Sequence, residues 1–333
     1  SYERYMLVAL RLARRQAGQT HPNPNVGAIL VKNNQIIAQG VTASGGRPHA
    51  ETIAINDAGA NAEGATLYVT LEPCSHHGKT LPCVDAIIKA GINRVVIACR
   101  DKNPIVSGNG IAALKNAGIE VIENICQKEA LEVNRGFFSV MEKKRPYIAL
   151  KIATSLDGKI TSPEGQWLTR ELAREFGHLL RSQHDAILTG IGTVLADDPL
   201  LTCRLAGLEN RSPIRIVLDR KGRIPTGSKL MQDGHGLWVM SHELPEAIAE
   251  ITKRGITSIL VEAGEKLTTA FLESKLVDRV YWFRAPIVVG NNGLALTYTL
   301  NNILKFNTIE HISLGDDSLD ILCNNTANNV LLP

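Results

Sequence analysis

Residues 67–98 read LYVTLEPCSHHGKTLPCVDAIIKAGINRVVIA, and they decide how the first half of the chain folds. Two apolar, β-branched runs predict strands, and the longer amphipathic stretch between them predicts a helix. These elements are expected at 67–71, 84–90 and 94–98. Strands joined through a helix are the building unit of a layered α/β fold. The loop after the first strand carries two cysteines, Cys74 and Cys83.

The segments around this unit continue the alternation of helices and strands. Asn33 and Asn34 tolerate positive φ and separate two apolar runs, which predicts a β-hairpin. Further strands are expected at 26–31, 36–38 and 119–122. Further helices are expected at 2–17, 49–58 and 111–117, and glycines close several of them. The first half therefore predicts one α/β layered domain.

A domain boundary is predicted at residues 142–146, EKKRP, where charges and a proline interrupt the apolar pattern. At 333 residues the chain is longer than one core usually supports, so we expect two domains, 1–145 and 146–333. The second half predicts strands at 147–153, 186–190, 214–219, 237–240, 258–263 and 279–289. A helix at 170–182 is expected behind Thr169 as its N-cap. Another helix is expected to run from Gly264 through Phe271.

The composition favours a folded enzyme with a small substrate. With 44% hydrophobic and 21% charged residues, the chain has the balance of globular proteins. The net charge of +3 is small for this length, so neither a nucleic acid nor a membrane is expected as a partner. The N-terminal region has no apolar signal-like run, which makes the cytoplasm the expected location. Without a secretory signal, the six cysteines indicate metal binding or burial rather than a disulfide framework.

The residues His49, Cys74 and Cys83 supply one imidazole and two thiols, which leave a tetrahedral zinc ion one position open to water. A proline precedes His49 and Cys83, so both are expected in the first turn of a helix, where the dipole favours a thiolate. Glu51 is a carboxylate that is not a ligand, and it can carry a proton between water and a leaving amine. This order of residues is the signature of zinc-dependent deaminases.

Two other interpretations of these residues remain. A structural zinc would need a fourth protein ligand, which His76 or His77 would supply. A nucleic-acid deaminase would need a basic track with aromatic side chains, whereas aromatic residues make up only 5% of this chain. Between the cysteines, His76, Lys79 and Thr80 are expected to meet an anionic group of the substrate beside the metal, the alternative being a solvated loop.

The motifs HAE at 49–51 and PCSHHGKTLPC at 73–83 resemble those of the bifunctional deaminase/reductase family of riboflavin biosynthesis. HPNPNVG at 21–27 and DKNP at 101–104 resemble other deaminase motifs of that family. The resemblance spans almost the whole chain. It implies an N-terminal cytidine-deaminase-like three-layer domain, in which Asn23 and Asp101 bind the pyrimidine or ribose. It also implies a C-terminal dihydrofolate-reductase-like α/β domain.

The second half carries the family's reductase motifs, TSLDGK at 154–159 and TGIGTVLADDPLLT at 189–202. By resemblance, the residues that contact NADPH are Ala153, Trp167, Thr193, Asp197, Gly264, Glu265, Lys266, Leu267, Thr268, Thr269 and Ala270. Those that face the substrate are Lys151, Arg181, Leu201, Arg204 and Glu262. From the residues alone, the helix start after Gly264 suits a pyrophosphate, although an ordinary tight turn explains it as well.

The resemblance implies zinc-dependent hydrolysis of the 2-amino group of a diaminopyrimidinone phosphoribosylamine, followed by NADPH reduction of its ribosyl group to ribityl. It also leads us to expect a homo-oligomer. The alternatives are a nucleic-acid or free-nucleoside zinc deaminase with an accessory domain, and a non-enzymatic zinc scaffold. Four positions depart from the family pattern: Thr42, Leu81, Gly165 and Arg220. Arg220 is where a small hydroxyl residue often stands, and by analogy it would meet the 2′-phosphate of the cofactor.

Overall fold

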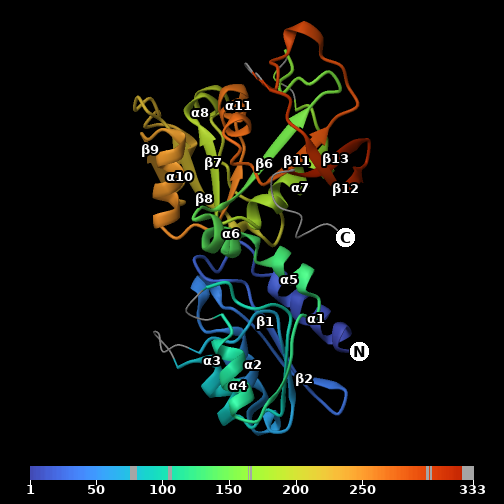
Figure 1. Ribbon diagram of the computed structural model, residues 1–333. Helices are drawn as coiled ribbons and strands as arrows, with labels where there is room; N and C mark the ends of the chain where they lie inside the picture. The colour runs from blue at the N-terminus through green and yellow to red at the C-terminus, as the bar shows by residue number, and fades with distance from the viewer. Residues whose placement is uncertain are drawn as a thin grey trace. The chain divides into compact units, whose positions relative to one another are not determined.

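The computed structural model of the protein describes residues 1–75, 81–103, 107–163, 165, 167–297, 300 and 302–324 (Figure 1). The chain divides into two compact units, Ser1–Arg145 and Pro146–Pro333. The division falls inside the charged, proline-containing run of the sequence. Within the described part of the chain, no helix is long and apolar enough to cross a membrane.

Unit 1 is built on a five-stranded sheet in the order β2-β1-β3-β4-β5. β1 is antiparallel to β2 and β3, whereas β3, β4 and β5 are parallel. The strands are β1 Gly27–Lys32, β2 Gln35–Val41, β3 Thr66–Val69, β4 Arg94–Ile97 and β5 Glu120–Ile122. The helices are α1 Tyr2–Arg14, α2 Ala50–Ala58, α3 Cys83–Lys89, α4 Asn109–Asn116, α5 Gln127–Val133 and α6 Arg135–Lys143.

Helices cover both faces of this sheet, and two glycines allow them to approach it closely. A Cβ atom on Gly27 would lie 2.0 Å from the Ala9 carbonyl oxygen of α1, and one on Gly40 would lie 2.1 Å from the Ala50 carbonyl oxygen of α2. Gly40 pairs with Ala28, so the two glycines point to opposite faces. α2, α3 and α4 lie on one side and α1 on the other, which gives the three layers (Figure 1).

The predictions for unit 1 are confirmed in their main features. Asn33 and Asn34 have φ values of 51° and 61°, as the tight hairpin turn requires. α1 ends at Arg14 rather than at residue 17, because the following residues form separate turns. α2 begins at Ala50, which makes His49 its N-cap rather than a residue of its first turn. The helices α5 and α6 are not predicted from the sequence.

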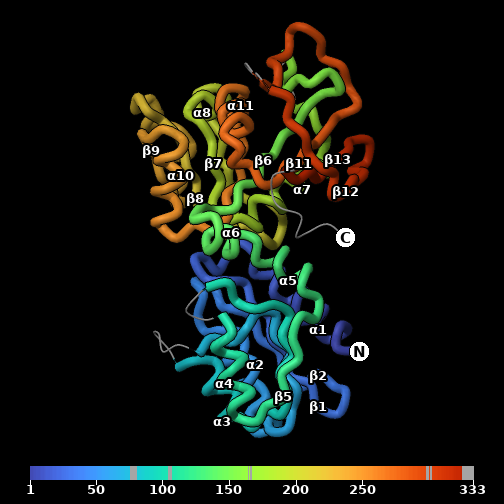
Figure 2. The backbone as a smooth tube through the Cα atoms, viewed as in Figure 1, coloured from blue at the N-terminus to red at the C-terminus, as the bar shows by residue number. Residues whose placement is uncertain are grey.

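Unit 2 contains an eight-stranded sheet in the order β12-β13-β11-β6-β10-β7-β8-β9. The six strands from β11 to β9 are parallel, and β13 is antiparallel to both of its neighbours. The strands are β6 Tyr147–Thr154, β7 Ala186–Gly190, β8 Ile214–Leu218, β9 Leu237–Met240, β10 Ser258–Val261, β11 Arg279–Arg284, β12 Phe306–Leu314 and β13 Asp317–Asn324. The helices are α7 Glu171–Ser182, α8 Ile191–Asp197, α9 Lys229–Gln232, α10 Leu244–Lys253 and α11 Glu265–Glu273 (Figure 2).

Two predictions for unit 2 need correction, and one hairpin is missed. The strand expected at 279–289 ends at Arg284, because the backbone turns back and the Ile287 N–H donates to the Ala285 carbonyl oxygen over 2.9 Å. Thr169 is not the N-cap of α7. Arg170 holds that position, and its N–H donates to the Asp317 carboxylate over 2.6 Å. The hairpin of β12 and β13 is not predicted.

Candidate functional sites

One edge of the unit 1 sheet brings together loops that are distant in the sequence. Because β1 is antiparallel to β3, the residues before Gly27 lie beside those after Val69. The Gly27 N–H donates to the Thr70 hydroxyl over 3.0 Å, and the Thr70 N–H donates to the Gly27 carbonyl oxygen over 3.1 Å. The end of β2 reaches the same edge, since the Thr42 N–H donates to the Val26 carbonyl oxygen over 2.9 Å. The carboxyl ends of parallel strands are where α/β sheets hold ligands.

His49, Cys74 and Cys83 meet at this edge. Their ligand atoms all lie within 4.8 Å of one another, so among the described residues these three side chains form the group that could hold a metal ion. We call this candidate site the metal-binding group. His49 Nδ1 is 3.2 Å from Cys83 Sγ and 3.6 Å from Cys74 Sγ. Tetrahedral zinc with ordinary Zn–N and Zn–S bonds separates such donors by about 3.6 Å. The three side chains therefore fit a zinc ion with little rearrangement.

The protonation of the two thiols is coupled. The Cys83 N–H donates to Cys74 Sγ over 3.4 Å. The Cys83 thiol, followed by His49, lowers the pKa of Cys74 to about 4. The adjacent Cys74 thiolate and burial raise the pKa of Cys83. Thiols bind a divalent cation as thiolates, so metal binding would release the proton that the raised pKa keeps on Cys83.

Glu51 lies in the first turn of α2, two residues after His49. Its side chain is buried, and burial raises the pKa of its carboxyl. A carboxyl group whose pKa is moved toward neutrality can both accept and return a proton near physiological pH. This environment suits the proton-transfer role expected from the sequence.

The expected pyrimidine contacts lie on loops of the same edge. The Asn23 side chain packs against Gly46, where a Cβ would lie only 2.0 Å from Asn23 Nδ2. Asp101 follows β4, is buried, and its carboxylate accepts the Asn103 N–H over 2.8 Å. His76, Lys79 and Thr80, together with His77, lie outside the described residues. Their contact with an anionic group of the substrate stays a prediction.

The loop that carries Asn23 is held by Asn134, which the sequence does not single out, and by Thr42. Asn134 is buried between α5 and α6, and its side chain accepts the Asn25 N–H over 2.8 Å and donates to the Asn25 carbonyl oxygen over 3.1 Å. The Thr42 hydroxyl accepts the Val26 N–H over 3.0 Å. Thr42 therefore supports the loop from inside. A sequence signal for Asn134 would have been the break that it makes between two helical segments.

In unit 2, three of the residues expected to face the substrate form one cluster. Arg181 in the last turn of α7 binds both oxygens of Glu262, over 2.7 and 2.9 Å. Lys151 on β6 lies 3.5 Å from the same carboxylate. Burial opposes the charged form of Glu262, but Arg181 and Lys151 outweigh it and lower its pKa to about 2. Arg181 therefore holds Glu262 in place. Because two of its guanidinium nitrogens bind Glu262, fewer donors remain for a substrate phosphate.

Leu201 and Arg204 lie beside this cluster. Leu201 is buried with a φ of 56°, and Arg181 donates to the next carbonyl oxygen, that of Thr202, over 3.0 Å. The Arg204 N–H donates to His178 Nδ1 over 3.2 Å. Burial, then Arg181 and Arg204, lower the pKa of His178 to about 4. These neighbouring cations create a positive potential that suits an anionic group.

Most of the residues that are expected to contact NADPH lie on α8 or at the start of α11. Gly264 is the N-cap of α11, and a Cβ on it would lie 3.8 Å from the Thr193 hydroxyl of α8. The first backbone N–H groups of a helix have no partner within it and can bind phosphate. Thr268 and Thr269 instead donate to carbonyl oxygens of their own segment. Trp167 is 78% exposed, and the Arg174 guanidinium lies 5.9 Å from its ring centre.

The remaining expected positions fall on elements of unit 2. Ala153 lies on β6, Asp197 is the last residue of α8, and Glu265 to Leu267 and Ala270 lie on α11. The Arg220 guanidinium pairs with Glu243 at the start of α10. Arg220 follows β8, which lies two strands from β10 in the sheet.

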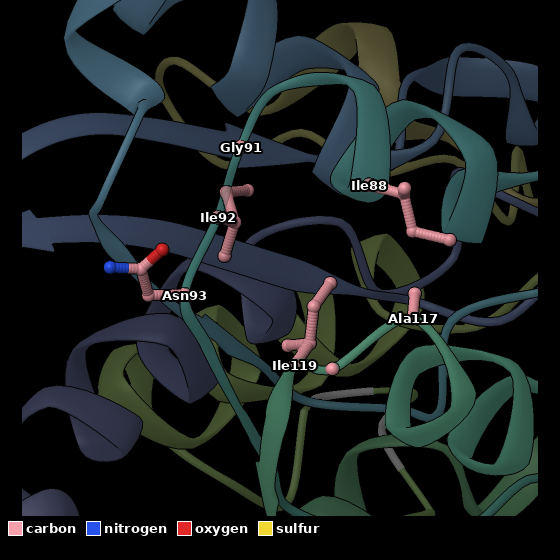
Figure 3. Close-up of a pocket in the computed structure, with 7 residues that line it drawn as sticks. Ile88, Gly91, Ile92, Asn93, Ala117 and Ile119 are labelled. Atoms are coloured by element: carbon pink, nitrogen blue, oxygen red, sulfur yellow. The ribbon is translucent and has the colours of Figure 1, made fainter.

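A surface pocket of about 280 Å³ opens at the opposite edge of the unit 1 sheet (Figure 3). Its lining comes from the end of α3 and from residues that lead into β4 and β5, among them Ile88, Asn93 and Ile119. The metal-binding group lies instead beyond the carboxyl ends of the parallel strands. The pocket is therefore separate from the place where the ionisable side chains gather.

Two protein families match the chain. Residues 146–319 match the RibD C-terminal domain, and residues 1–99 match the cytidine and deoxycytidylate deaminase zinc-binding region. The second match contains the three metal-binding side chains and Glu51.

Curated relatives match along nearly their whole length. The riboflavin biosynthesis protein RibD of Escherichia coli is 41% identical, over 93% of this chain and 96% of its own. That of Aquifex aeolicus is 39% identical, over 94% of this chain and 96% of its own. A solved structure of Acinetobacter baumannii RibD is similar with a TM-score of 0.89 at 37% identity, covering 97% of this chain and 98% of that one. The diaminohydroxyphosphoribosylaminopyrimidine deaminase/5-amino-6-(5-phosphoribosylamino)uracil reductase of Thermotoga maritima gives 0.88 with the same identity and coverage.

Proposed function

The chain belongs to the RibD family of bifunctional riboflavin biosynthesis enzymes, and from this premise we propose which of its residues serve each reaction. The protein is a deaminase of the diaminohydroxyphosphoribosylaminopyrimidine and a reductase of the phosphoribosylaminouracil. Residues 1–145 carry the deamination in this proposal, and residues 146–333 carry the reduction. The observation that carries it is the convergence of His49, Cys74 and Cys83 beside the buried Glu51.

In the deaminase unit, His49, Cys74 and Cys83 hold zinc. Zinc bound by three protein ligands leaves a position for water and lowers the pKa of that water toward neutrality. Glu51 accepts the first proton of the attacking water at its carboxylate and delivers it to the ring nitrogen. It then accepts the second proton from the oxygen added to the ring and delivers it to the amine, which leaves as ammonia. Asn23 and Asp101 orient the pyrimidine and ribose, together with His76, Lys79 and Thr80.

In the reductase unit, NADPH supplies the hydride that converts the ribosyl group to ribityl. The backbone of residues 264–270 at the start of α11 holds the pyrophosphate, and Thr193 lies beside it. Ala153, Trp167 and Asp197 complete the cofactor contacts. Lys151 and Glu262 face the ribosyl group, Leu201 borders it, and Arg204 meets the phosphate while Arg181 fixes Glu262. The ion-pair network around Glu262 supports this assignment.

The preference for NADPH is assigned to Arg220. Adjacent strands lie about 4.8 Å apart, so the turn after β8 stands about 10 Å from the start of α11, within reach of the adenosine end of a cofactor. Arg220→Ser should weaken binding of 2′-phospho-ADP-ribose and leave that of ADP-ribose unchanged, as measured by calorimetry. Equal weakening of both ligands would remove Arg220 from the 2′-phosphate site.

A homo-oligomer in the cytoplasm is part of the same proposal. Leu156 and Val288 are 60% and 73% exposed, and the Leu156 N–H donates to the Ile287 carbonyl oxygen over 2.8 Å, which joins the two segments into one apolar surface. A reducing compartment suits the free cysteines. Light scattering of the wild type and of a Val288→Asp variant tests the assembly, and a monomeric wild type would contradict it.

The proposed reactions are tested together by incubating the zinc-loaded protein with the diamino substrate, with and without NADPH. Mass spectrometry should show only the deaminated product without NADPH, and the ribityl product when NADPH is present. Formation of the ribityl diamino compound without prior deamination would contradict the proposed order.

A further inference from the structure

Glu72 is a buried carboxylate that stands two residues before the zinc ligand Cys74, and neither proposed reaction gives it a role. Its side chain is among the buried charged groups, at 3% exposure. Such a charge is costly in the interior unless hydrogen bonds replace its hydration. Four backbone N–H groups do so, and they come from two different segments of unit 1.

Three of these donors belong to the start of α4. One oxygen of Glu72 accepts the N–H groups of Gly110 and Ile111 over 3.1 and 3.3 Å. The other oxygen accepts the Gly108 N–H over 3.1 Å. A negative charge is favourable here, because the first N–H groups of a helix lack partners and carry partial positive charge. Glu72 thus ties the loop after β3 to the first turn of α4.

The fourth donor belongs to the loop after β4. The Asp101 N–H donates to Glu72 over 3.3 Å, and the Glu72 N–H donates in turn to the Cys99 carbonyl oxygen over 3.0 Å. Asp101 is the residue to which the proposed function gives a substrate contact. A single carboxylate therefore joins the loop that carries a zinc ligand to the loop that carries Asp101.

The peptide of the zinc ligand also rests directly on α4. A Cβ on Gly110 would lie 2.1 Å from the Pro73 carbonyl oxygen, so only glycine allows this approach. On the other side, the Val84 N–H of α3 donates to the Cys74 carbonyl oxygen over 3.2 Å. Cys74 is thus held between α3 and α4, and Glu72 provides the polar contacts on the α4 side.

We propose that Glu72 is a positioning residue that sets the place of Cys74 in the zinc site and of Asp101 in the substrate site at the same time. It contacts neither zinc nor substrate, and acts through the backbone of the two loops. The part that concerns Asp101 rests on the proposed function, whereas the part that concerns Cys74 rests on the metal site alone. Outer contacts of this kind commonly change metal affinity by about 10–100-fold.

The test uses the full chain with Glu72→Gln, in which one carboxylate oxygen becomes an NH₂ group that faces N–H donors. We expect zinc release to a chelator to be faster by roughly tenfold, with an altered absorption spectrum of the cobalt-substituted protein. We also expect the KM for deamination to rise by roughly tenfold, because a small displacement of a binding loop has large effects. Reduction of the deaminated compound should stay at the wild-type rate.

Two further variants make the result specific. Glu120→Gln is the matched control, since the Glu120 side chain is 54% exposed and pairs with Arg94 on the same sheet; it should behave as the wild type. Gly110→Ala places a methyl group 2.1 Å from the Pro73 carbonyl oxygen and 3.3 Å from Glu72 Oε1, so it displaces the contacts of α4 with both and keeps the Glu72 charge. It should therefore also speed zinc release, and unchanged release from the folded variant would contradict the proposal. This second variant tests the proposal even if Glu72→Gln does not fold.

A lowered melting temperature of Glu72→Gln with unchanged zinc release, cobalt spectrum and KM would overturn the proposal, because Glu72 would then be purely structural. Zinc release is measured without substrate. Failure of the wild type to deaminate the diamino compound would therefore count against the proposed function alone, and the metal measurements would still decide the role of Glu72.

Discussion

At the residue scale, the proposed deaminase site includes the first turns of two short helices. Cys83 is the first residue of α3 and Glu51 lies in the first turn of α2, so the positive ends of both helices face the metal-binding group. Burial disfavours the charged form of the Glu51 carboxyl and so raises its pKa. The Glu51 carboxyl can therefore transfer protons. It lies beside two thiols that become thiolates when zinc binds.

Cys83→Ser should lower zinc affinity and deamination together, because a hydroxyl is a poorer zinc ligand than a thiolate. The loss of affinity should exceed about 100-fold, since the loss of an outer contact alone costs about 10–100-fold. Zinc content after dialysis against a chelator measures it. Cys126→Ser is the matched control outside the ligand group and should retain zinc. Full zinc occupancy in Cys83→Ser would point to a different ligand.

Glu51→Gln should keep one zinc per chain and lose deamination by about 10²–10⁴-fold, because a carboxamide cannot carry the proton. Elemental analysis and ammonia release measure the two properties on the same sample. Loss of zinc from this variant would mean that Glu51 is a ligand or holds one.

The sequence predicts which three side chains come together, because zinc ligands are restricted to a few residue types at a recognisable spacing. The supporting residues follow a different logic. Asn134 reaches Asn25 across 109 positions of sequence, and Thr42 reaches Val26 across 16. Such contacts depend on which loops the sheet brings together. Single polar residues give no local signal of them.

At the element scale, Glu262 after β10 connects α7 through Arg181 and β6 through Lys151. Its pKa is lowered to about 2 in the folded protein, from an ordinary value of 4.5. The charged form therefore stabilises the fold fully above pH 4.5, and this contribution is lost as the pH falls toward 2. At one pKa unit per 1.36 kcal/mol, it amounts to about 3 kcal/mol at most.

In Glu262→Gln, the free energy of unfolding should therefore fall less steeply than in the wild type as the pH decreases from 4.5 to about 2. Unit 2 can be followed alone in the full chain, because all three tryptophans, Trp167, Trp238 and Trp282, lie in it. Urea unfolding by tryptophan fluorescence at several pH values measures the effect. The pKa of Asp157 is also about 2, so its protonation contributes the same pH dependence of stability to the wild type and to the variant. Equal slopes in the wild type and the variant would show that the ion-pair network adds no stability.

Most elements with strong apolar periodicity are predicted correctly, whereas several short or exposed elements are not. β12 exposes most of its residues, so it lacks the alternation that marks a half-buried strand. α5 and α6 are separated only by Asn134 and are each short. Their apolar residues Ala130 and Phe138 are buried by packing against the rest of unit 1.

At the scale of the whole molecule, each unit has its own sheet and its own buried apolar clusters. Expressed separately, residues 1–145 and 146–333 should each fold, as measured by cooperative thermal unfolding. The first piece should bind zinc and the second should retain reduction of the deaminated pyrimidine. Aggregation of both pieces from a soluble parent would argue for one shared core.

The two-site assignment predicts that the full-length Glu51→Gln protein still oxidises NADPH when given the deaminated pyrimidine, and does so poorly with the diamino compound. Lys151, Arg181 and Glu262 all lie in unit 2, so the loss of Glu51 should leave reduction at the wild-type rate. A site built to pair with the new ring carbonyl would reject the amino group, since mismatched buried polar groups stay unsatisfied. NADPH absorbance is recorded with each substrate in turn. Wild-type rates with the deaminated compound are expected, whereas loss of that reduction in a folded, zinc-loaded Glu51→Gln protein would contradict separate sites.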